Sequence, residues 1–277
     1  MRELAGKTAF VTGGASGIGF ALGRAFAEAG MNVILADIET DALAAAAGSL
    51  HDFAPRVRGV ACDVTDPLCV ERAAKASYET FGNVHVVCNN AGVGGGFDNF
   101  SLENWRWVLD VNVMGVLHGI STFVPHIRAH GEGGHIVNTA SVAGMQAAQG
   151  FSPYPASKFA VVSMSEGLAT ELKPLGIGVS VLCSGPVRTR ILESSRNRQE
   201  RYGPRAPRLE SPAAAWISQI AENVQSGLDP MDVAARVLTA IREDDLYVFT
   251  HPSGKWRAKT EERFAAILAA MDKAAAR

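Results

Sequence analysis

Short apolar runs alternate along the chain with longer segments in which apolar residues recur every three or four positions. The short runs are nearly continuous in Val, Ile, Leu and Ala, as in strands that are buried on both faces. They predict strands at 7–12, 32–36, 57–62, 84–88, 134–140, 177–183 and 245–249. The longer segments predict helices at 20–29, 40–50, 66–81, 102–129, 155–174, 211–226, 230–242 and 256–275. This alternation is typical of an α/β fold with a parallel sheet.

Polar residues at the predicted helix ends support these boundaries. Asp66 and Asp229 each precede a proline, which suits a capping carboxylate followed by the first helical residue. Ser101 is the expected cap of the helix at 102–129. Asn112 lies inside that helix although asparagine disfavours helix interiors, so we expect its amide to make a buried or a functional hydrogen bond.

A glycine-rich turn, Gly13-Gly14-Ala15-Ser16-Gly17-Ile18-Gly19, separates the first predicted strand from the first helix. Glycines let the backbone approach a pyrophosphate, and the unpaired N–H groups and dipole of a helix N-terminus attract its charge. The spacing is Gly-x-x-x-Gly-x-Gly, and a glycine turn at this place is structural about as often as it binds a nucleotide. The turn therefore predicts a nucleotide site only together with further signals.

Asp37 supplies one such signal at the end of the second predicted strand. An acidic residue roughly 20 positions after the glycines is placed to accept hydrogen bonds from an adenosine ribose, and it repels a 2′-phosphate. The neighbouring positions carry Ser16, Ile38 and Glu39, and not an Arg or Lys that would favour NADP. We therefore expect NAD rather than NADP, with helix capping by Asp37 as the alternative.

Two further polar segments follow predicted strands and so meet the same edge of the sheet, where ligands bind in doubly wound folds. Asp63 follows the third strand and is placed to accept from an adenine amino group. Asn89-Asn90-Ala91-Gly92 follows the fourth strand, and its small residues permit close approach to a ligand. Turn chemistry is an equally good explanation of these asparagines alone.

Tyr154 and Lys158 lie four residues apart, on one face of a helix. A phenol has a pKa of about 10, and an ammonium beside it favours the phenolate. Lowering that pKa to about 7 takes roughly 4 kcal/mol, so a second positive charge is expected nearby. Taken alone, the pair is usually an ordinary helix start with an exposed lysine.

The bulk composition limits the partners and the location. The chain has 277 residues, 47% of them hydrophobic, and a formal net charge of −2. This balance gives no electrostatic reason to expect nucleic acid or an anionic membrane. The spacing of Cys62, Cys69, Cys88 and Cys183 is not typical of a metal site, and no apolar run reaches the roughly 20 residues of a membrane span. We expect a soluble, cytoplasmic protein with reduced cysteines and no signal peptide.

The segment at 190–228 differs from the rest in its arginines and prolines, and it follows the sixth predicted strand. A basic run is usually a solvated face, but this position also suits a substrate lid over the sheet edge. The arginines are Arg196, Arg198, Arg201, Arg205 and Arg208. We expect one domain over 1–277, with this lid and a C-terminal helical tail at about 252–277.

Taken together and in this order, the motifs resemble those of the short-chain dehydrogenase/reductase family from about residue 5 to residue 250. The resemblance rests on Thr12-Gly13-x-x-x-Gly17-x-Gly19, Asp63, Asn89-Asn90-Ala91-Gly92, Asn112, Ser141, Tyr154-x-x-x-Lys158 and Gly185-x-Val187-x-Thr189. Ser184 departs from the proline that is common before this last glycine. The resemblance implies a single doubly wound Rossmann domain with a seven-stranded, mostly parallel sheet and helices on both faces.

It also implies an oxidoreductase that interconverts secondary alcohols and ketones with NAD. Tyr154 is then the acid/base, Lys158 bonds the nicotinamide ribose, Ser141 holds the substrate oxygen, and Asn112 anchors a water relay. Oxidised nicotinamide supplies the second positive charge. The implied cofactor contacts are Gly13, Ser16, Gly17, Ile18, Gly19, Asp37, Asp63, Val64, Asn90, Ala91, Gly92, Tyr154, Lys158, Val187 and Thr189, and no metal is implied.

The lid and the stretch from Gly227 to Pro252 further resemble a subgroup that includes the Cα-dehydrogenases of lignin aryl-ether breakdown, which suggests a bulky hydrophobic or aromatic alcohol. Phe97, Met145, Gln146 and Phe151 flank the motifs and are placed either to line an apolar pocket or to pack in the core. Reduction of a 3-oxoacyl, cyclic-ketone or steroid-like substrate is the alternative activity, and an NAD-binding regulator is the non-enzyme alternative. The family also implies a homodimer or homotetramer through the helices at 102–129 and 155–174, with Trp105 and Trp107 as interface anchors or core.

Overall fold

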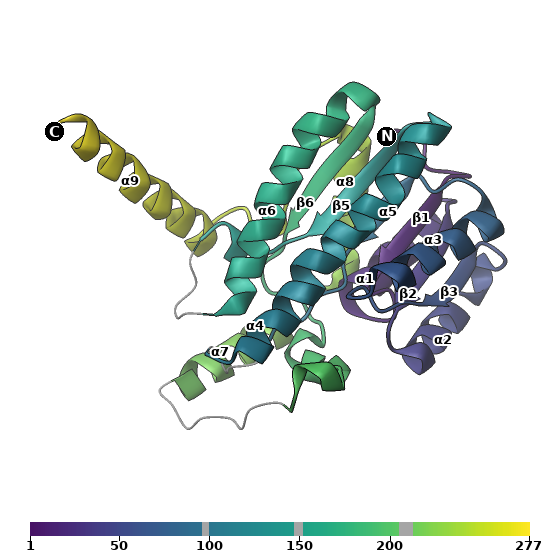
Figure 1. Ribbon diagram of the computed structural model, residues 1–277, viewed down its shortest axis with the longest axis horizontal. Helices are drawn as coiled ribbons and strands as arrows, with labels where there is room; N and C mark the ends of the chain where they lie inside the picture. The colour runs from purple at the N-terminus through teal and green to yellow at the C-terminus, as the bar shows by residue number, and fades with distance from the viewer. Residues whose placement is uncertain (96–99, 147–151, 205–212) are drawn as a thin grey trace.

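A computed structural model of the chain describes residues 1–95, 100–146, 152–204 and 213–277, with the side chains of 213–217 left out. Its centre is one seven-stranded sheet in the order β3-β2-β1-β4-β5-β6-β7, and each neighbouring pair of strands is parallel (Figure 1). The strands are β1 Thr8–Thr12, β2 Asn32–Asp37, β3 Val57–Ala61, β4 Val86–Asn89, β5 Gly134–Thr139, β6 Ile177–Cys183 and β7 Tyr247–Phe249. The doubly wound Rossmann fold is confirmed.

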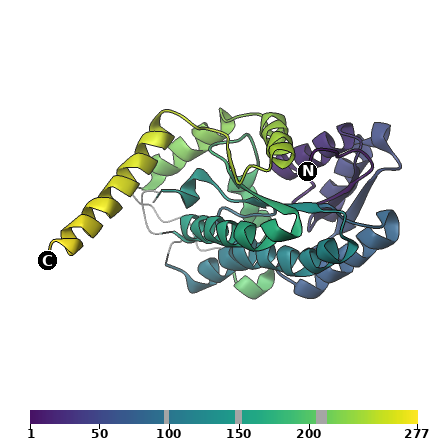
Figure 2. The same ribbon diagram turned by 90° about the horizontal axis from the view of Figure 1, so that it is seen from above.

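Helices connect the strands and cover both faces of the sheet (Figure 2). They are α1 Gly17–Glu28, α2 Thr40–Ser49, α3 Pro67–Phe81, α4 Leu102–Leu109, α5 Gly115–His130, α6 Pro153–Leu172, α7 Ala213–Gln225, α8 Pro230–Glu243 and α9 Lys255–Ala275. Asp66, Ser101 and Asp229 accept hydrogen bonds from the backbone N–H groups of their own helices, as expected. Short 3-10 turns lie at 51–53, 142–144, 173–175, 191–197 and 200–202, and a π turn lies at 110–114.

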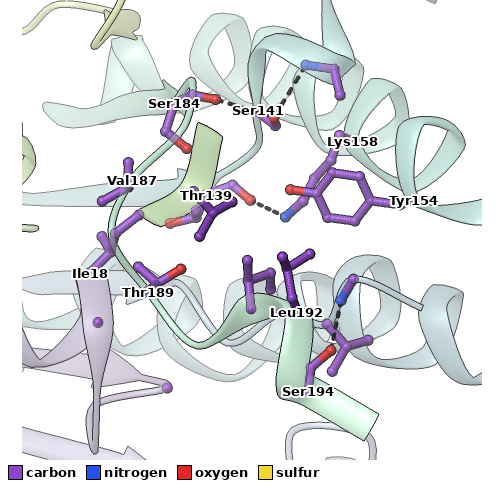
Figure 3. Close-up of a pocket in the computed structure, with 18 of the residues that line it drawn as sticks. Ile18, Thr139, Ser141, Tyr154, Lys158, Ser184, Val187, Thr189, Leu192 and Ser194 are labelled. Carbon is purple, nitrogen blue, oxygen red and sulfur yellow. Dashed lines mark hydrogen bonds between the residues drawn. The ribbon is translucent and has the colours of Figure 1, made fainter. Parts of the chain in front are cut away.

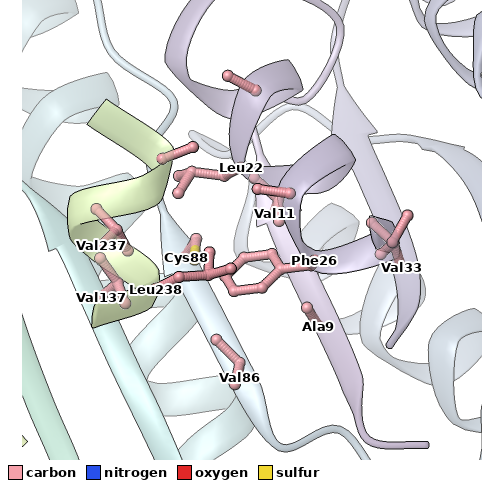
Figure 4. Close-up of a cluster of buried hydrophobic side chains, with 14 of the residues drawn as sticks. Ala9, Val11, Leu22, Phe26, Val33, Val86, Cys88, Val137, Val237 and Leu238 are labelled. Carbon is pink, nitrogen blue, oxygen red and sulfur yellow. The ribbon is translucent and has the colours of Figure 1, made fainter. Parts of the chain in front are cut away.

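One face of the sheet packs against α1, α2 and α8. Phe26 of α1 is fully buried between the strands and the side chains of α8, beside Val237 and Leu238 (Figure 4). The strand side chains beneath them come from β1, β2, β4 and β5, which are continuous in small and β-branched residues. This packing fixes the position of α1, and with it the glycine turn that precedes the helix.

The opposite face is covered by α3, α5 and α6, with Phe10 stacked on Phe123 at 4.5 Å between ring centroids. The helix at 102–130 is long and apolar enough to cross a membrane, the one such helix in the described part of the chain. Its residues Trp107, Phe123 and Ile127 are buried in this core, which is typical of the central helix of a globular protein. Trp107 is therefore a core residue, not an interface anchor.

The observed element ends differ from the predicted ones by up to three residues. Helix α1 begins at Gly17 instead of 20, so Gly17 and Gly19 of the glycine turn lie in its first turn. Helix α6 begins at Pro153 and includes Tyr154, two residues earlier than predicted. Strand β4 begins at Val86 instead of 84, and β7 begins at Tyr247 instead of 245. Glycine and proline mark helix starts ambiguously, because both occur within the first turn as well as before it.

Helix α9 extends away from the body of the protein, with the C-terminus at its far end (Figures 1 and 2). None of its residues is buried. Its first turns stay close to the fold, where Arg263 stacks on the ring of Phe159 from α6 at 5.0 Å.

Candidate active site

A cavity of about 630 Å³ lies at the carboxyl edge of the sheet. The loops that follow β1 to β6 line it, and the direction of the chain crossovers changes between β1 and β4. Such a change of direction leaves a crevice between two loops at the edge of a parallel sheet, the usual ligand position in this architecture.

The glycine turn forms the wall of the cavity beside β1. Gly13 and Gly17 have φ angles of +66° and +54°, which favour glycine. A Cβ on Gly19 would lie 2.0 Å from the Gly13 carbonyl oxygen, so this turn closes only with glycine. Ser16 precedes α1 without a side-chain hydrogen bond to the helix end. The first N–H groups of α1 are thus available to an anion such as a pyrophosphate.

Thr12 fastens the end of β1 to the loop after β4. Its hydroxyl accepts hydrogen bonds from the N–H groups of Asn90 and Ala91, at 2.9 and 3.0 Å. The Asn90 amide donates back to the Thr12 carbonyl at 3.0 Å and accepts from the Thr139 hydroxyl at 3.2 Å. The amides in this loop therefore hold three strand ends together, and they leave the backbone of Ala91 and Gly92 facing the cavity.

Asp37 ends β2 as a buried carboxylate that borders the cavity. One oxygen accepts from the N–H of Ala15 at 2.9 Å, and the other accepts from the N–H of Glu39 at 3.0 Å. Asp37 therefore binds backbone N–H groups, as the capping alternative requires, and can also accept from a ligand. Each of its carboxylate oxygens keeps a further lone pair for this purpose.

Tyr154, Lys158 and Ser141 meet on the far side of the cavity. Lys158 is buried, donates to the Thr139 carbonyl at 2.8 Å, and lies 5.5 Å from the centre of the Tyr154 ring. Figure 3 shows the phenol and the ammonium side by side, opposite Val187 and Thr189. Ser141 follows β5, and its hydroxyl donates to the Ser184 carbonyl at 3.2 Å.

Burial dominates the electrostatics of this group. It raises the pKa of Tyr154, and a hydrogen bond with the Ser141 hydroxyl only partly offsets this rise. Burial also lowers the pKa of Lys158 to about 8. The pKa of Tyr154 thus stays above its usual value although the Lys158 ammonium lies beside its ring.

Asn112 lies in the π turn between α4 and α5, and its amide is fully used. It accepts from the Val93 N–H at 2.8 Å and donates to the Val93 carbonyl and the Ser157 hydroxyl, both at 3.0 Å. The expected reason for a mid-helix asparagine is thus a buried hydrogen-bond network. A π turn of this kind often occurs at functional sites.

The residues at 190–202, here called the 190–202 segment, cross the cavity next to β2. Arg196 donates to Glu39 at 2.6 and 3.1 Å, and Asn197 donates to the same carboxylate at 2.9 Å. The hydrogen bond from Arg196 lowers the pKa of Glu39. The sequence alone did not indicate this contact, because Arg196 is 157 residues from Glu39 along the chain.

The same segment also reaches Asp63 after β3. Gln199 donates to the Asp63 Oδ2 atom at 2.9 Å, with Arg201 3.4 Å from the same oxygen. Thr65 donates to the other oxygen from its N–H and its hydroxyl, at 2.9 and 2.6 Å. Burial works against ionisation, but these hydrogen bonds keep the pKa of Asp63 below its usual value.

The structure gathers nearly all the predicted site residues around this one cavity. Gly19 and Asn112 support the walls without lining it. Gln146 lines the cavity, whereas Met145 packs beside the core cluster of β6 and α6. Phe97, Phe151, Arg205 and Arg208 lie outside the described residues.

One histidine cluster lies at the opposite, amino edge of the sheet. His85, His130 and Glu132 bring possible metal-ligand atoms within 4.8 Å of one another. Their ring nitrogens and carboxylate already contact each other, backbone groups and Lys7. This arrangement is explained by local hydrogen bonds.

Comparisons with known proteins agree with the geometry. The family model described as short chain dehydrogenase matches residues 7–200. A "C alpha-dehydrogenase" of Sphingobium sp. strain SYK-6 is 32% identical over 271 residues, which cover 97% of this chain and 87% of that protein.

Two solved structures are similar over nearly their whole length. A short chain dehydrogenase/reductase from Burkholderia phymatum, in complex with NAD, is 40% identical with a TM-score of 0.91, and the match covers 97% of this chain and 96% of the other. The apo form of LigO from Sphingobium sp. strain SYK-6 is 32% identical with a TM-score of 0.81, over 99% of this chain and 92% of the other.

Proposed function

The chain belongs to the short-chain dehydrogenase family, and we propose that it interconverts a bulky hydrophobic or aromatic secondary alcohol and its ketone, with NAD as cofactor. Its membership makes it an oxidoreductase that acts on CH–OH groups. The observation that carries the proposal is the meeting of Tyr154, Lys158 and Ser141 on one wall of the cavity, opposite the glycine turn and the Val187 loop.

The residues present fit a dinucleotide. The uncapped N-terminus of α1 and the glycine turn suit a pyrophosphate, and Asp37 suits a ribose hydroxyl. When bound, oxidised NAD would supply the acceptor for the carbinol hydride and, before its reduction, a positive charge near the phenol. Lys158, held by the Thr139 carbonyl, is then placed to bond the second ribose.

In this mechanism Ser141 holds the substrate oxygen while Tyr154 removes the carbinol proton. The reverse reaction uses the same phenol as the acid that protonates the ketone oxygen. Asn112 fixes the loop at Val93 and the start of α6, so it positions the group and anchors the proposed water relay from Lys158. A phenol and a hydroxyl that both reach one oxygen form the minimum site for this proton transfer.

The preference for NAD rests on the charge at the ribose end of the cavity. Asp37 is buried there and would repel a 2′-phosphate. Glu39 is paired with Arg196, so the described residues of this wall offer no unpaired cation that could bind a 2′-phosphate. The bulky substrate rests on the apolar side chains of the 190–202 segment and α7, which border the cavity beside Tyr154.

We also propose a homodimer or homotetramer that packs through α4–α5 and α6, where Leu102, Met114 and Leu117 are exposed. The free thiols of Cys62, Cys88 and Cys183 favour a reducing compartment such as the cytoplasm. Light scattering on the purified protein measures the number of subunits.

A panel of aryl, cyclic and 3-hydroxyacyl alcohols with NAD, and of the matching ketones with NADH, tests the function through the NADH absorbance. We expect turnover of aromatic or polycyclic secondary alcohols above the rest. Tight NAD binding without turnover of any panel member would favour the regulator instead.

A further inference from the structure

Gln146 is a polar side chain without a partner at the edge of the cavity. It is 5% exposed, and neither its Oε1 nor its Nε2 atom has a hydrogen-bond partner among the residues that the structure describes. It follows the 3-10 turn that Ser141 caps, so it belongs to the loop of the proposed substrate-binding serine. An unpaired buried amide is costly, and a ligand that fills this end must bring hydrogen-bonding atoms.

Two lysines border the same cavity from the first turn of α9. Lys255 and Lys259 are four residues apart and therefore share a face of that helix. The structure describes no ion pair for either, whereas the neighbouring Arg257 is paired with Glu261. The ammonium of Lys255 instead lies 5.2 Å from the ring of Trp256, which also lines the cavity.

The acidic side chains that line the cavity come from the end of β2 and from the loops after β2 and β3. Asp37, Glu39 and Asp63 are the described carboxylates that line it, and they follow β2 and β3 at the end assigned to adenosine. Each already accepts hydrogen bonds from backbone groups or from the 190–202 segment. The carboxylates of the cavity are thus already hydrogen-bonded at the adenosine end, whereas two lysines without a described ion pair and one unsatisfied amide line it elsewhere.

We propose that the natural substrate is a secondary alcohol that also carries a carboxylate. Gln146 donates to a carboxylate oxygen inside the cavity, and Lys255 and Lys259 attract the charge from its mouth. An ammonium acts over a screening length of about 8 Å at physiological salt, so it need not touch the anion. This inference names the substrate class of the proposed dehydrogenase and rests on that function.

Matched pairs of substrates test it: 4-(1-hydroxyethyl)benzoate and its methyl ester, and the corresponding pair built on naphthalene. Each pair shares the reacting carbinol and differs in the charge. We expect kcat/KM to favour the acid by about tenfold or more, as for a hydrogen bond to a charged group. The preference should shrink as the salt concentration rises.

Variants test which residues cause the preference for the acid over its ester. The double variant Lys255→Ala, Lys259→Ala should reduce the acid-over-ester ratio toward one, chiefly through KM. Lys273→Ala makes the same charge change at the distal end of α9, away from the cavity, and should leave the ratio unchanged. Gln146→Leu should lower kcat/KM for the acids by about tenfold, and Gln146→Glu should affect the acids more than the esters.

Equal or better turnover of the esters overturns the carboxylate and leaves the dehydrogenase function standing. An acid preference that persists in the lysine and Gln146 variants overturns the roles of these residues. If no alcohol or ketone reacts although NAD binds, the proposed function itself fails, and the inference fails with it.

Discussion

Tyr154 is a half-buried phenol whose pKa is raised by its loss of contact with water. Its neighbour Lys158 is directed to the Thr139 carbonyl, and burial has lowered the pKa of this lysine as well. In the proposed mechanism a bound cation would favour the base form of the tyrosine. The oxidised nicotinamide of the proposed cofactor is such a cation. Proton transfer by Tyr154 would therefore require NAD to be bound, with its pyrophosphate at the glycine turn.

Replacing Tyr154 by phenylalanine removes the proton acceptor without changing the packing of the ring. We expect turnover to fall by about a thousandfold or more, in line with the loss of general acid–base catalysis. NAD affinity, measured by quenching of protein fluorescence, should change little. Turnover close to that of the unmodified protein would remove Tyr154 from the chemistry.

Asp37→Ser removes the carboxylate at the proposed ribose site. We expect kcat/KM with NAD to fall by about tenfold or more, because hydrogen bonds to a charged group are lost, and kcat/KM with NADP to rise. Steady-state rates with both cofactors measure this. Asp41→Ser, on the first turn of α2, is the control. Tighter binding of NADPH than of NADH by the unmodified protein would contradict the assignment.

Among the elements, the 190–202 segment is held by side-chain contacts to Glu39 and Asp63 and by the buried ring of Tyr202. Glu39→Gln should loosen it, because the ion pair with Arg196 is only partly exposed, at 26% and 23% of the two side chains. We expect faster trypsin cleavage after Arg196, Arg198 or Arg201, with saturating NAD restoring some protection. Glu28→Gln, which breaks a remote surface pair with Arg24, should cleave at the original rate.

Strands β5 and β6 enclose His135, whose ring contacts Ser180 at 2.8 Å. Burial lowers its pKa from 6.5 to about 3. Between these values the unfolded chain binds a proton that the folded protein does not, so stability is present above pH 6.5 and falls as the pH drops toward 3.

His135→Gln should therefore reduce the acid sensitivity of the fold. The unmodified protein is expected to lose up to about 1.4 kcal/mol more per pH unit than the variant between pH 6 and 4. Urea unfolding at each pH measures the difference. His51→Gln, at an exposed position, should show no such effect, and equal slopes for His135→Gln would contradict the argument.

At the scale of the whole molecule, the cavity joins segments from the glycine turn to the start of α9. A ligand that spans them binds the folded state alone. At a concentration of 100 times its dissociation constant, NAD should add about 2.7 kcal/mol of stability. For a domain of this size we expect a rise of roughly 5–8 °C in the midpoint of thermal unfolding.

Differential scanning fluorimetry checks this rise. NADP at the same concentration should give a smaller shift, and Tyr154→Phe should keep the full shift with NAD. Failure of both NAD and NADH to raise the midpoint would contradict dinucleotide binding.

Local patterns were enough to predict the sheet, the glycine turn, Asp37, Asp63 and the Tyr154–Lys158 pair. Each depends on neighbours in the sequence: an apolar run, a glycine that permits a positive φ, or a four-residue helical spacing. Element ends were less predictable, because Gly17 and Pro153 are compatible with positions on either side of a helix start.

Local sequence patterns could not predict the contacts between segments that lie far apart in the chain. The pairing of Arg196 with Glu39, the unpartnered amide of Gln146 and the approach of Lys255 to the cavity depend on the packing of the 190–202 segment and α9. The sequence indicated that Asn112 needed a partner, but only the structure shows that Val93 and Ser157 provide it.

Burial raises the pKa of Tyr154, which in the proposed mechanism favours binding of the oxidised cofactor before the alcohol. A phenol that stays protonated in the absence of NAD⁺ cannot take the carbinol proton, so in the proposed mechanism an alcohol bound alone would not react. The positive charge of bound NAD⁺ would favour the phenolate, and the phenolate can take the proton of the alcohol. On the proposed mechanism we therefore expect NAD to bind before the alcohol, and NADH to leave after the ketone.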